Sequence, residues 1–274
     1  MSTITAADVN KLRTMTGAGM MDCKKALTEA NGDFEAAIDI LRKKGQKVAA
    51  NRSDRDAKEG RVVAFTADNR AVLIMVNCET DFVANNADFS NFVDTIAKVA
   101  LEKNPTDIEA LKALPYAGNG QTIGEKIIEQ VGKIGEKIEL SRYEVMNAPD
   151  VTAYNHPGNK LATIVGFSKK ASGEIGKDVA MQIAAMSPVS VDKDSIPADL
   201  IARELEIARE QIRQEGKPED MVEKIAQGKL NKFYKESTLL NQEFIKDGKK
   251  TVRQYITDSD KELSVTGFKR IALG

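Results

Sequence analysis

Several residue types are scarce in this sequence. Its 274 residues include no tryptophan, one histidine, two cysteines and only 5% aromatic side chains. Cys23 and Cys78 are far apart and follow no spacing pattern, which indicates neither a disulfide framework nor a zinc site. A single histidine also disfavours His-pair metal sites and most proton-shuttling mechanisms. We therefore expect no metal and no cofactor, and a binding protein rather than an enzyme.

An excess of one charge and a long apolar run are missing as well. The formal net charge is −1 and the pI is near 6.1, which is not the signature of a protein that binds a polyanion directly. The longest clean apolar run, Ala71 to Val76, falls far short of the roughly 18 residues of a membrane span. The first residues lack the basic and apolar regions of a secretory signal. These observations predict a cytoplasmic protein with no direct nucleic-acid partner and no membrane partner.

The pattern of residues 1–45 predicts three short helices. Thr5 begins an N-cap pattern for the first helix, Asp22 is expected to cap the second, and Asp33 is expected to cap the third. The third helix is expected to end before Gly45. Such a small group of helices has little core, which is typical of a docking domain.

Basic residues are in excess over residues 42–58, where only Asp54 and Asp56 oppose them. Two interpretations stay open for this segment. It is either a solvated linker or a basic patch for an acidic partner.

Two hairpins, each followed by helix and then strand, organise the rest of the chain. The first hairpin is expected at 62–66 and 71–77, and the second at 151–155 and 161–167. Later segments are expected as helices at 89–100, 123–134 and 176–185, and as strands at 137–145 and 265–272. The repeated order predicts an α+β fold with an internal duplication.

The second copy carries an insertion at about 198–236. Ile201, Leu205, Ala208 and Ile212 are spaced by three and four residues, and a Gly-Lys-Pro turn leads to a second apolar stripe. Two such helices predict an antiparallel coiled-coil hairpin that is too narrow to form a domain alone. It serves either contact with another protein, including a second copy of the chain, or packing on its own core.

These patterns divide the chain into three parts. We expect a three-helix domain at 1–54, a first core subdomain at 55–147, and a second core subdomain at 148–274 that carries the coiled-coil arm.

The sequence offers little to a search for catalytic chemistry. Gly118–Gly124 is one residue too long for a dinucleotide fingerprint and follows no strand, so we interpret it as a flexible loop. The motifs of zinc proteases, calcium loops, nucleophile elbows and kinases are missing. His156, at the second hairpin tip, has no assignable acid or nucleophile beside it, which favours a contact residue over a base.

Two segments stand out. In Thr16–Leu27, Met20 and Met21 follow a glycine-rich turn and precede Lys24. Adjacent methionines at a helix entrance form an adaptable apolar contact surface, or they fill a small core.

The second segment is Cys78–Ala84, which leaves the first hairpin. Thr80 is a suitable cap for a short helix. Asp81 and Phe82 then form either an exposed wedge of the kind that anchors interfaces, or a helix start with Phe82 in the core.

Both segments resemble the signature motifs of the bacterial elongation factor Ts family. TGAGMMDCKKAL and CETDFVA are intact here, and the resemblance covers essentially the whole chain. Further matching stretches are Ile134–Glu136, His156, Gly228–Phe233 and Val265–Phe268. The resemblance implies a ubiquitin-associated-like three-helix N-terminal domain, a duplicated α+β core and a coiled-coil arm.

The same resemblance implies guanine nucleotide exchange on the GTPase elongation factor Tu. Asp81 and Phe82 are then expected to insert beside its magnesium and phosphate region, and Ile134 and Gly135 to contact the same domain. The family pattern adds Met20, Met21 and Lys24 as contacts to that domain, and His156 as a contact to the third domain. The alternative function is a non-catalytic interaction scaffold or chaperone-like module.

Overall fold

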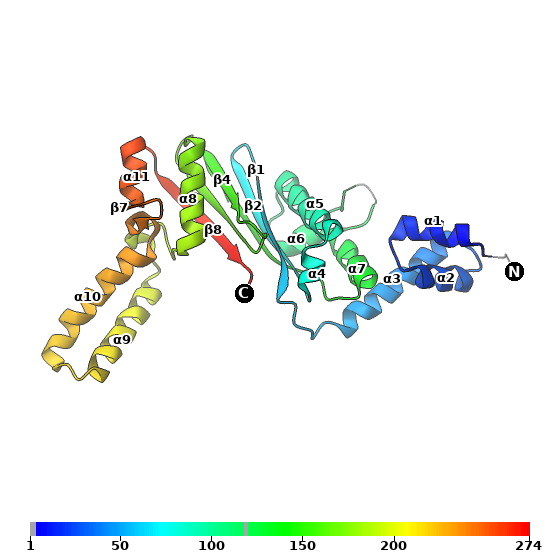
Figure 1. Cartoon of the computed structure of the whole chain (residues 1–274), viewed down its shortest axis with the longest axis horizontal. Coiled ribbons are helices and arrows are strands. Elements are labelled where there is room, and N and C mark those ends of the chain that lie inside the picture. The colour runs from blue at the N-terminus through cyan, green and yellow to red at the C-terminus, as the bar shows by residue number, and fades with distance from the viewer. Residues whose placement is uncertain (1–3, 118–119) are drawn as a thin grey trace. The chain divides into compact units, whose positions relative to one another are not determined.

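A computed structural model describes residues 4–117 and 120–274 (Figure 1). The α-helices in this part of the chain are α1 Ala6–Thr16, α2 Met20–Glu29, α3 Phe34–Asn51, α4 Asp81–Ala84, α5 Ala87–Lys103, α6 Ile108–Ala113, α7 Ile123–Ile134, α8 Gly173–Met186, α9 Ala198–Gln214, α10 Glu219–Ser237 and α11 Val252–Ser259. The strands are β1 Glu59–Ala67, β2 Arg70–Cys78, β3 Glu139–Asn147, β4 Asp150–Asn155, β5 Leu161–Phe167, β6 Glu243–Phe244, β7 Asp247–Thr251 and β8 Val265–Ala272. Helices and small sheets together give the α+β structure that the sequence predicts.

The contacts within the chain divide it into two compact units. The first unit contains residues 4–63, 73–144 and 271–274, with 118 and 119 outside the described residues, and the second contains Ala64–Val72 and Val145–Arg270. The first hairpin therefore contributes to both units.

Three helices open the first unit. Thr5 caps α1 as predicted, because its hydroxyl accepts the Asp8 N–H at 3.2 Å while the Asp8 carboxylate accepts the Thr5 N–H at 3.0 Å. Asp33 caps α3 as predicted, because its carboxylate accepts the Ala36 N–H at 3.0 Å. The prediction that Asp22 caps the second helix is wrong, since α2 already begins at Met20 and Asp22 lies in its first turn. A small core of α1, α2 and α3 side chains contains Val9, Leu12, Cys23, Ala26, Leu27 and Ala37.

The third helix does not end at Gly45, so that prediction is also wrong. Instead, α3 continues to Asn51, and Gly45 is buried inside it. A Cβ on Gly132 of α7 would lie 2.9 Å from the Cα of Gly45, so the backbones of the two helices nearly touch. Gly45 is thus a crossing point and not a stop signal. The basic residues at 42–51 belong to a helix.

The first sheet has the strand order β1-β2-β3. Both strands of the predicted first hairpin are present, and Asp68, in the turn between them, has a φ of 49°. Thr122 caps α7 with a complete capping box, so this helix has the bounds that the sequence predicts. Gly118 and Asn119 of the predicted flexible loop lie outside the described residues.

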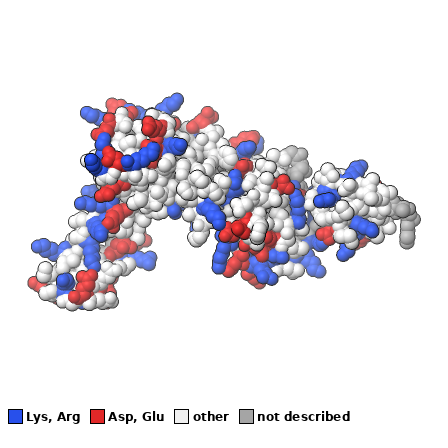
Figure 2. Space-filling model, in the orientation of Figure 1, with Lys and Arg blue, Asp and Glu red and all other residues white. Residues whose placement is uncertain are grey.

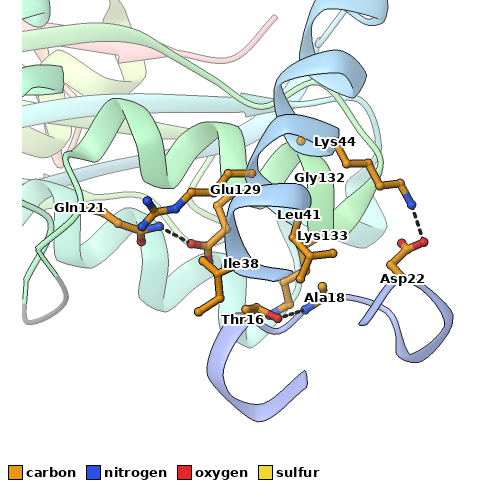
Figure 3. A pocket seen from close by; sticks show the side chains of 12 residues that line it. Thr16, Ala18, Asp22, Ile38, Leu41, Lys44, Gln121, Glu129, Gly132 and Lys133 are labelled. Atoms are coloured by element: carbon orange, nitrogen blue, oxygen red, sulfur yellow. Dashed lines mark hydrogen bonds and ion pairs between the residues drawn. The ribbon is translucent and has the colours of Figure 1, made fainter. Parts of the chain in front are cut away.

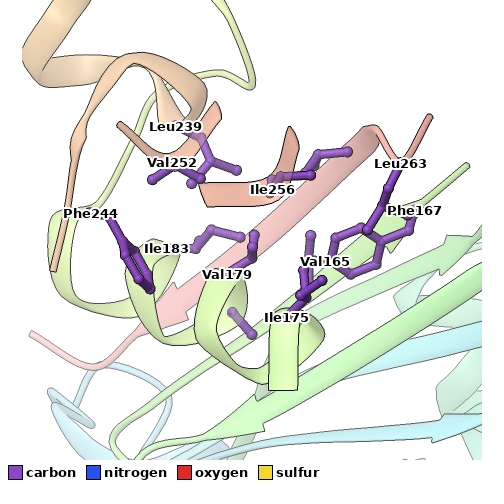
Figure 4. Packing of buried hydrophobic residues seen from close by; sticks show 12 residues of the cluster. Val165, Phe167, Ile175, Val179, Ile183, Leu239, Phe244, Val252, Ile256 and Leu263 are labelled. Atoms are coloured by element: carbon purple, nitrogen blue, oxygen red, sulfur yellow. The ribbon is translucent and has the colours of Figure 1, made fainter. Parts of the chain in front are cut away.

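The second sheet has the order β4-β5-β8. Its hairpin is antiparallel, with Asp150 opposite Phe167 and Asn155 opposite Ala162. Helix α8 packs on both strands of this hairpin. Figure 4 shows side chains of α8 and α11 meeting β5 in one apolar cluster, which includes Val165, Phe167, Ile175, Val179, Ile183, Val252 and Ile256.

The sequence pattern missed the segment that carries β6, β7 and α11. The buried amide of Gln182 holds this segment, because its Nε2 donates to the Glu243 carbonyl at 3.1 Å and its Oε1 accepts the Ile245 N–H at 2.9 Å. Two-residue and five-residue strands are too short for alternation to reveal.

Helices α9 and α10 pack side by side within the second unit. Their seam buries Ala208, Ile212, Val222 and Ala226. Ion pairs flank it, among them Arg209 with Glu223, whose closest atoms are 2.9 Å apart.

Candidate functional site

The turn after β2 presents an exposed aromatic side chain. Thr80 caps the four-residue helix α4, and its hydroxyl accepts the Val83 N–H at 3.5 Å. Phe82 is 86% exposed, while Ala84 on the same helix is buried. Asp81 is exposed as well. The sequence allowed two interpretations of this segment, with Phe82 either exposed or in the core. The structure shows that Phe82 is exposed.

The connection from α7 to β3 lies against this turn. Ile134 is the last residue of α7, and Gly135 ends the helix in the left-handed region with a φ of 80°. The next residue, Glu136, has a carboxylate that accepts the N–H of Glu79 at 3.1 Å and the N–H of Thr80 at 3.0 Å. It also accepts the Thr80 hydroxyl at 2.6 Å. Two predicted contact segments are thus joined by hydrogen bonds.

Glu79 makes the reciprocal connection. Its carboxylate accepts the Lys137 N–H at 2.6 Å and the Arg52 guanidinium at 2.7 Å. These bonds, the Lys137 N–H first and then Arg52, hold the pKa of the Glu79 carboxyl below its ordinary value although burial opposes them. Arg52 stands at the end of α3, so three segments meet here. We call Glu79, Thr80, Glu136 and Lys137 the carboxylate clasp.

We predict that Glu79→Gln destabilises the chain only where the carboxylate is ionised. The pKa of Glu79 is lowered from 4.5 in the folded state, so its stabilisation is present above that value and is lost as the pH falls through the folded pKa. We expect the free energy of unfolding to drop by about 1–2 kcal/mol at pH 7. Urea unfolding at several pH values checks this. A loss that stays constant down to pH 3 would contradict it.

Cys78 lies beside the clasp but is not a nucleophile. Its thiol donates to the Thr80 carbonyl at 3.1 Å. Burial, and then the negative charges of Glu136 and Glu59, raise the pKa of this thiol to about 12. A thiol that stays protonated at neutral pH is a weak nucleophile.

The two adjacent methionines lie on the surface of the N-terminal helices. Met20 is 54% exposed and Met21 is 64% exposed. With Lys24 they line a surface pocket of about 370 Å³ whose other side is formed by Ile4, Thr5, Ala6, Val9 and Asn10. They are therefore available for contact and do not fill the core.

A second pocket lies where α3 meets α7. Figure 3 shows Asp22 reaching toward Lys44, with which it forms an ion pair, and Glu129 meeting Gln121. The cavity measures about 50 Å³, which is room for one or two water molecules. It is too small for an organic ligand.

His156 belongs to the second unit, whereas the other predicted contact residues belong to the first. It is exposed, and its Nδ1 lies 2.9 Å from the Tyr154 hydroxyl oxygen. The neighbouring Asn155 fixes the strand end, because its amide donates to the Ala64 carbonyl at 2.9 Å and accepts the Ala64 N–H at 2.7 Å.

Two kinds of feature bear on metal and membrane binding, a cluster of metal-binding side chains and a membrane-spanning helix. Within 4–117 and 120–274, no group of three or more His, Cys, Asp or Glu side chains is arranged to hold a metal ion. No helix in that part of the chain combines the length and apolarity needed to cross a bilayer. On the face shown in Figure 2, Lys and Arg alternate with Asp and Glu instead of forming one basic surface.

Comparison with known proteins agrees with the two motifs. The family profile described as Elongation factor TS matches residues 79–274. The chain is 53% identical to elongation factor Ts of Flavobacterium psychrophilum and 54% identical to that of Cytophaga hutchinsonii, each over 278 residues and the full length of both chains. It is 50% identical to the Porphyromonas gingivalis protein over 270 residues, 98% of each chain.

The chain belongs to the elongation factor Ts family. Its function is nucleotide exchange in translation elongation, and the scaffold or chaperone-like alternative is not favoured. The sequence singled out Phe82, which the structure shows to be exposed, but it did not indicate that Arg52, Glu79 and the carboxylate of Glu136 hold the turn that carries it. One signal could have pointed to two of them: Glu79 and Glu136 both lie in stretches that match the family. Arg52 lies in no such stretch.

Proposed function

We propose that the chain binds elongation factor Tu in its GDP-bound state and accelerates the release of GDP. The observation that carries the proposal is the exposure of Phe82 on a turn held by the carboxylate clasp. An exposed aromatic side chain on a fixed turn is the type of anchor that dominates protein interfaces. The factor makes and breaks no covalent bond in this role, so it needs no catalytic group.

Exchange requires that the factor and the nucleotide weaken each other's binding to the GTPase. This coupling is reciprocal, and it arises only from contacts that favour the nucleotide-free state. A nucleotide held with a nanomolar Kd represents about 12 kcal/mol. In our proposal Phe82 inserts between elements of the GTPase, and the Asp81 carboxylate disturbs the magnesium and phosphate environment because it repels the negative phosphates and attracts the magnesium ion.

The remaining contact residues fit the same role. Gly135 has open space where a Cβ would stand, which suits the approach of a partner, and Ile134 before it is half-buried. Both are proposed to contact the nucleotide-binding domain of elongation factor Tu. Met20, Met21 and Lys24 are proposed to touch that domain too. His156 is proposed to contact the third domain of the GTPase.

We further propose that the chain has the family's domain organisation. This comprises a ubiquitin-associated-like domain at 1–54, two related α+β subdomains at 55–147 and 148–274, and a coiled-coil arm at about 198–236. The equivalent strand orders β1-β2-β3 and β4-β5-β8 support the duplication. The arm is proposed as a surface for protein contact, including self-association, and the protein as cytoplasmic.

The proposal is tested with elongation factor Tu carrying a fluorescent GDP analogue. Substoichiometric amounts of the factor, mixed with excess unlabelled GDP, are expected to accelerate release of the analogue from all the elongation factor Tu molecules, because each factor molecule acts on many of them in turn. Complex formation without accelerated release would instead support a scaffold. Elongation factor Tu mixed with buffer gives the spontaneous rate.

A further inference from the structure

The turn that carries Phe82 has little structure of its own. Helix α4 has only four residues, and a helix of one turn is not stable by itself. The orientation of Phe82 therefore depends on tertiary contacts. Within α4, Ala84 is the one residue that is buried.

The carboxylate of Glu136 supplies three of these contacts. It accepts three hydrogen bonds, from the N–H groups of Glu79 and Thr80 and from the Thr80 hydroxyl, at 2.6–3.1 Å. Hydrogen bonds to an ionised acceptor are roughly twice as strong as those between neutral groups. They reach across 56 and 57 residues of sequence, from the connection between α7 and β3 to the residues directly before Asp81 and Phe82.

The Thr80 hydroxyl connects Glu136 to the wedge itself. It donates to Glu136 and accepts the Val83 N–H, one residue after Phe82. With its proton directed to Glu136, the hydroxyl presents a lone pair to the helix start. The carboxylate thus fixes the cap that fixes the first turn of α4.

We infer that Glu136 is a positioning residue for nucleotide exchange, which holds Asp81 and Phe82 in the orientation that the GTPase meets. This inference rests on the proposed function. Glu136 acts through the Thr80 cap and not by contact with the nucleotide. Its loss lowers the fraction of molecules with a competent wedge and leaves the other contact surfaces intact.

Glu136→Ala is expected to lower the maximal rate of GDP release by about fivefold to tenfold, the effect of a competent fraction reduced by the same factor. The factor concentration at half-maximal rate is expected to change by less than about twofold, because the other contacts remain. Glu136→Gln, whose amide oxygen still accepts the two N–H groups, is expected to restore most of the rate. If Glu136→Ala does not fold, Glu136→Asp replaces it, since the shorter side chain cannot span the same distances.

Two further variants separate positioning from general destabilisation. In a Phe82→Ala background, Glu136→Ala is expected to slow release by much less than the fivefold to tenfold loss that it causes in the wild type, because Glu136 acts through the turn that carries Asp81 and Phe82. Glu139→Ala is the control, because Glu139 is an exposed acid three residues after Glu136 and its carboxylate lies 3.4 Å from the side-chain amine of Lys137. It is expected to exchange at the wild-type rate. Additive losses in the double variant would overturn the inference.

Hydrogen exchange in the free factor gives a readout that needs no GTPase. The amides of Glu79 and Thr80 are expected to exchange faster in Glu136→Ala, whereas the amides of α8 keep the wild-type rate. If the two amides are as protected from hydrogen exchange in Glu136→Ala as in the wild type, the inference is overturned, even when the wild-type factor accelerates GDP release normally. A wild-type protein that fails to accelerate GDP release would refute the proposed function and leave the hydrogen-exchange result to be judged separately.

Discussion

Phe82→Ala is expected to slow the maximal rate of stimulated GDP release by about tenfold or more, the equivalent of about 1.4 kcal/mol. The same change is expected to leave the midpoint of thermal unfolding within about 1 °C, because an 86% exposed side chain contributes little to the core. Stopped-flow release of a fluorescent GDP analogue and thermal unfolding followed by circular dichroism measure the two effects.

Met186→Ala is the matched control for this prediction. Met186 is also a large apolar side chain, 46% exposed, but it lies in the second unit at the end of α8. We expect release at the wild-type rate from this variant. If both variants slowed release equally, the effect would come from lost apolar surface in general. Unchanged release with Phe82→Ala would refute the wedge.

Gly132→Ala is expected to destabilise the first unit by about 1–3 kcal/mol, the usual cost of overpacking. The new Cβ would lie 2.9 Å from the Cα of Gly45, and a backbone atom cannot rotate away as a flexible side chain does. Helices α3 and α7 must therefore separate. For a chain of this size we expect the thermal midpoint to fall by several degrees.

Gly228→Ala provides the opposite expectation from the same chemical change. Gly228 also lies inside a helix, α10, but open space surrounds the position of its Cβ. Alanine there is expected to stabilise the helix by about 0.5–1 kcal/mol through its better helix propensity. The two midpoints should therefore move in opposite directions. A similar rise in both would show that the helix crossing tolerates a side chain.

Local signals in the sequence predicted much of the fold. The helical pattern at 123–134, the alternation in both hairpins and the closing strand predicted elements close to the positions where the structure has them. These signals act over three or four residues. The failures involve longer distances: α3 continues through Gly45 because another helix passes there, and α11 is stabilised by a core that β5 and α8 complete.

The candidate site shows the same division. Phe82 could be singled out because its motif is contiguous in sequence, but the Thr80 cap fits both a buried and an exposed Phe82, and only the structure shows that the side chain is exposed. The carboxylate clasp could not be recognised in the sequence, because Glu136 is hydrogen-bonded to Thr80 across 56 residues and Glu79 to Lys137 across 58. Side-chain hydrogen bonds of that range depend on the completed sheet. No local periodicity encodes them.

The burial of both cysteines makes the chain suitable for site-specific labelling. The thiols of Cys23 and Cys78 are fully enclosed, and the latter remains protonated at neutral pH. A maleimide fluorophore reacts with accessible thiolates. A single cysteine introduced by Met186→Cys will therefore carry the dye, and the two native cysteines need not be replaced. Association of the factor with its GTPase can then be followed by an emission signal that is independent of the nucleotide.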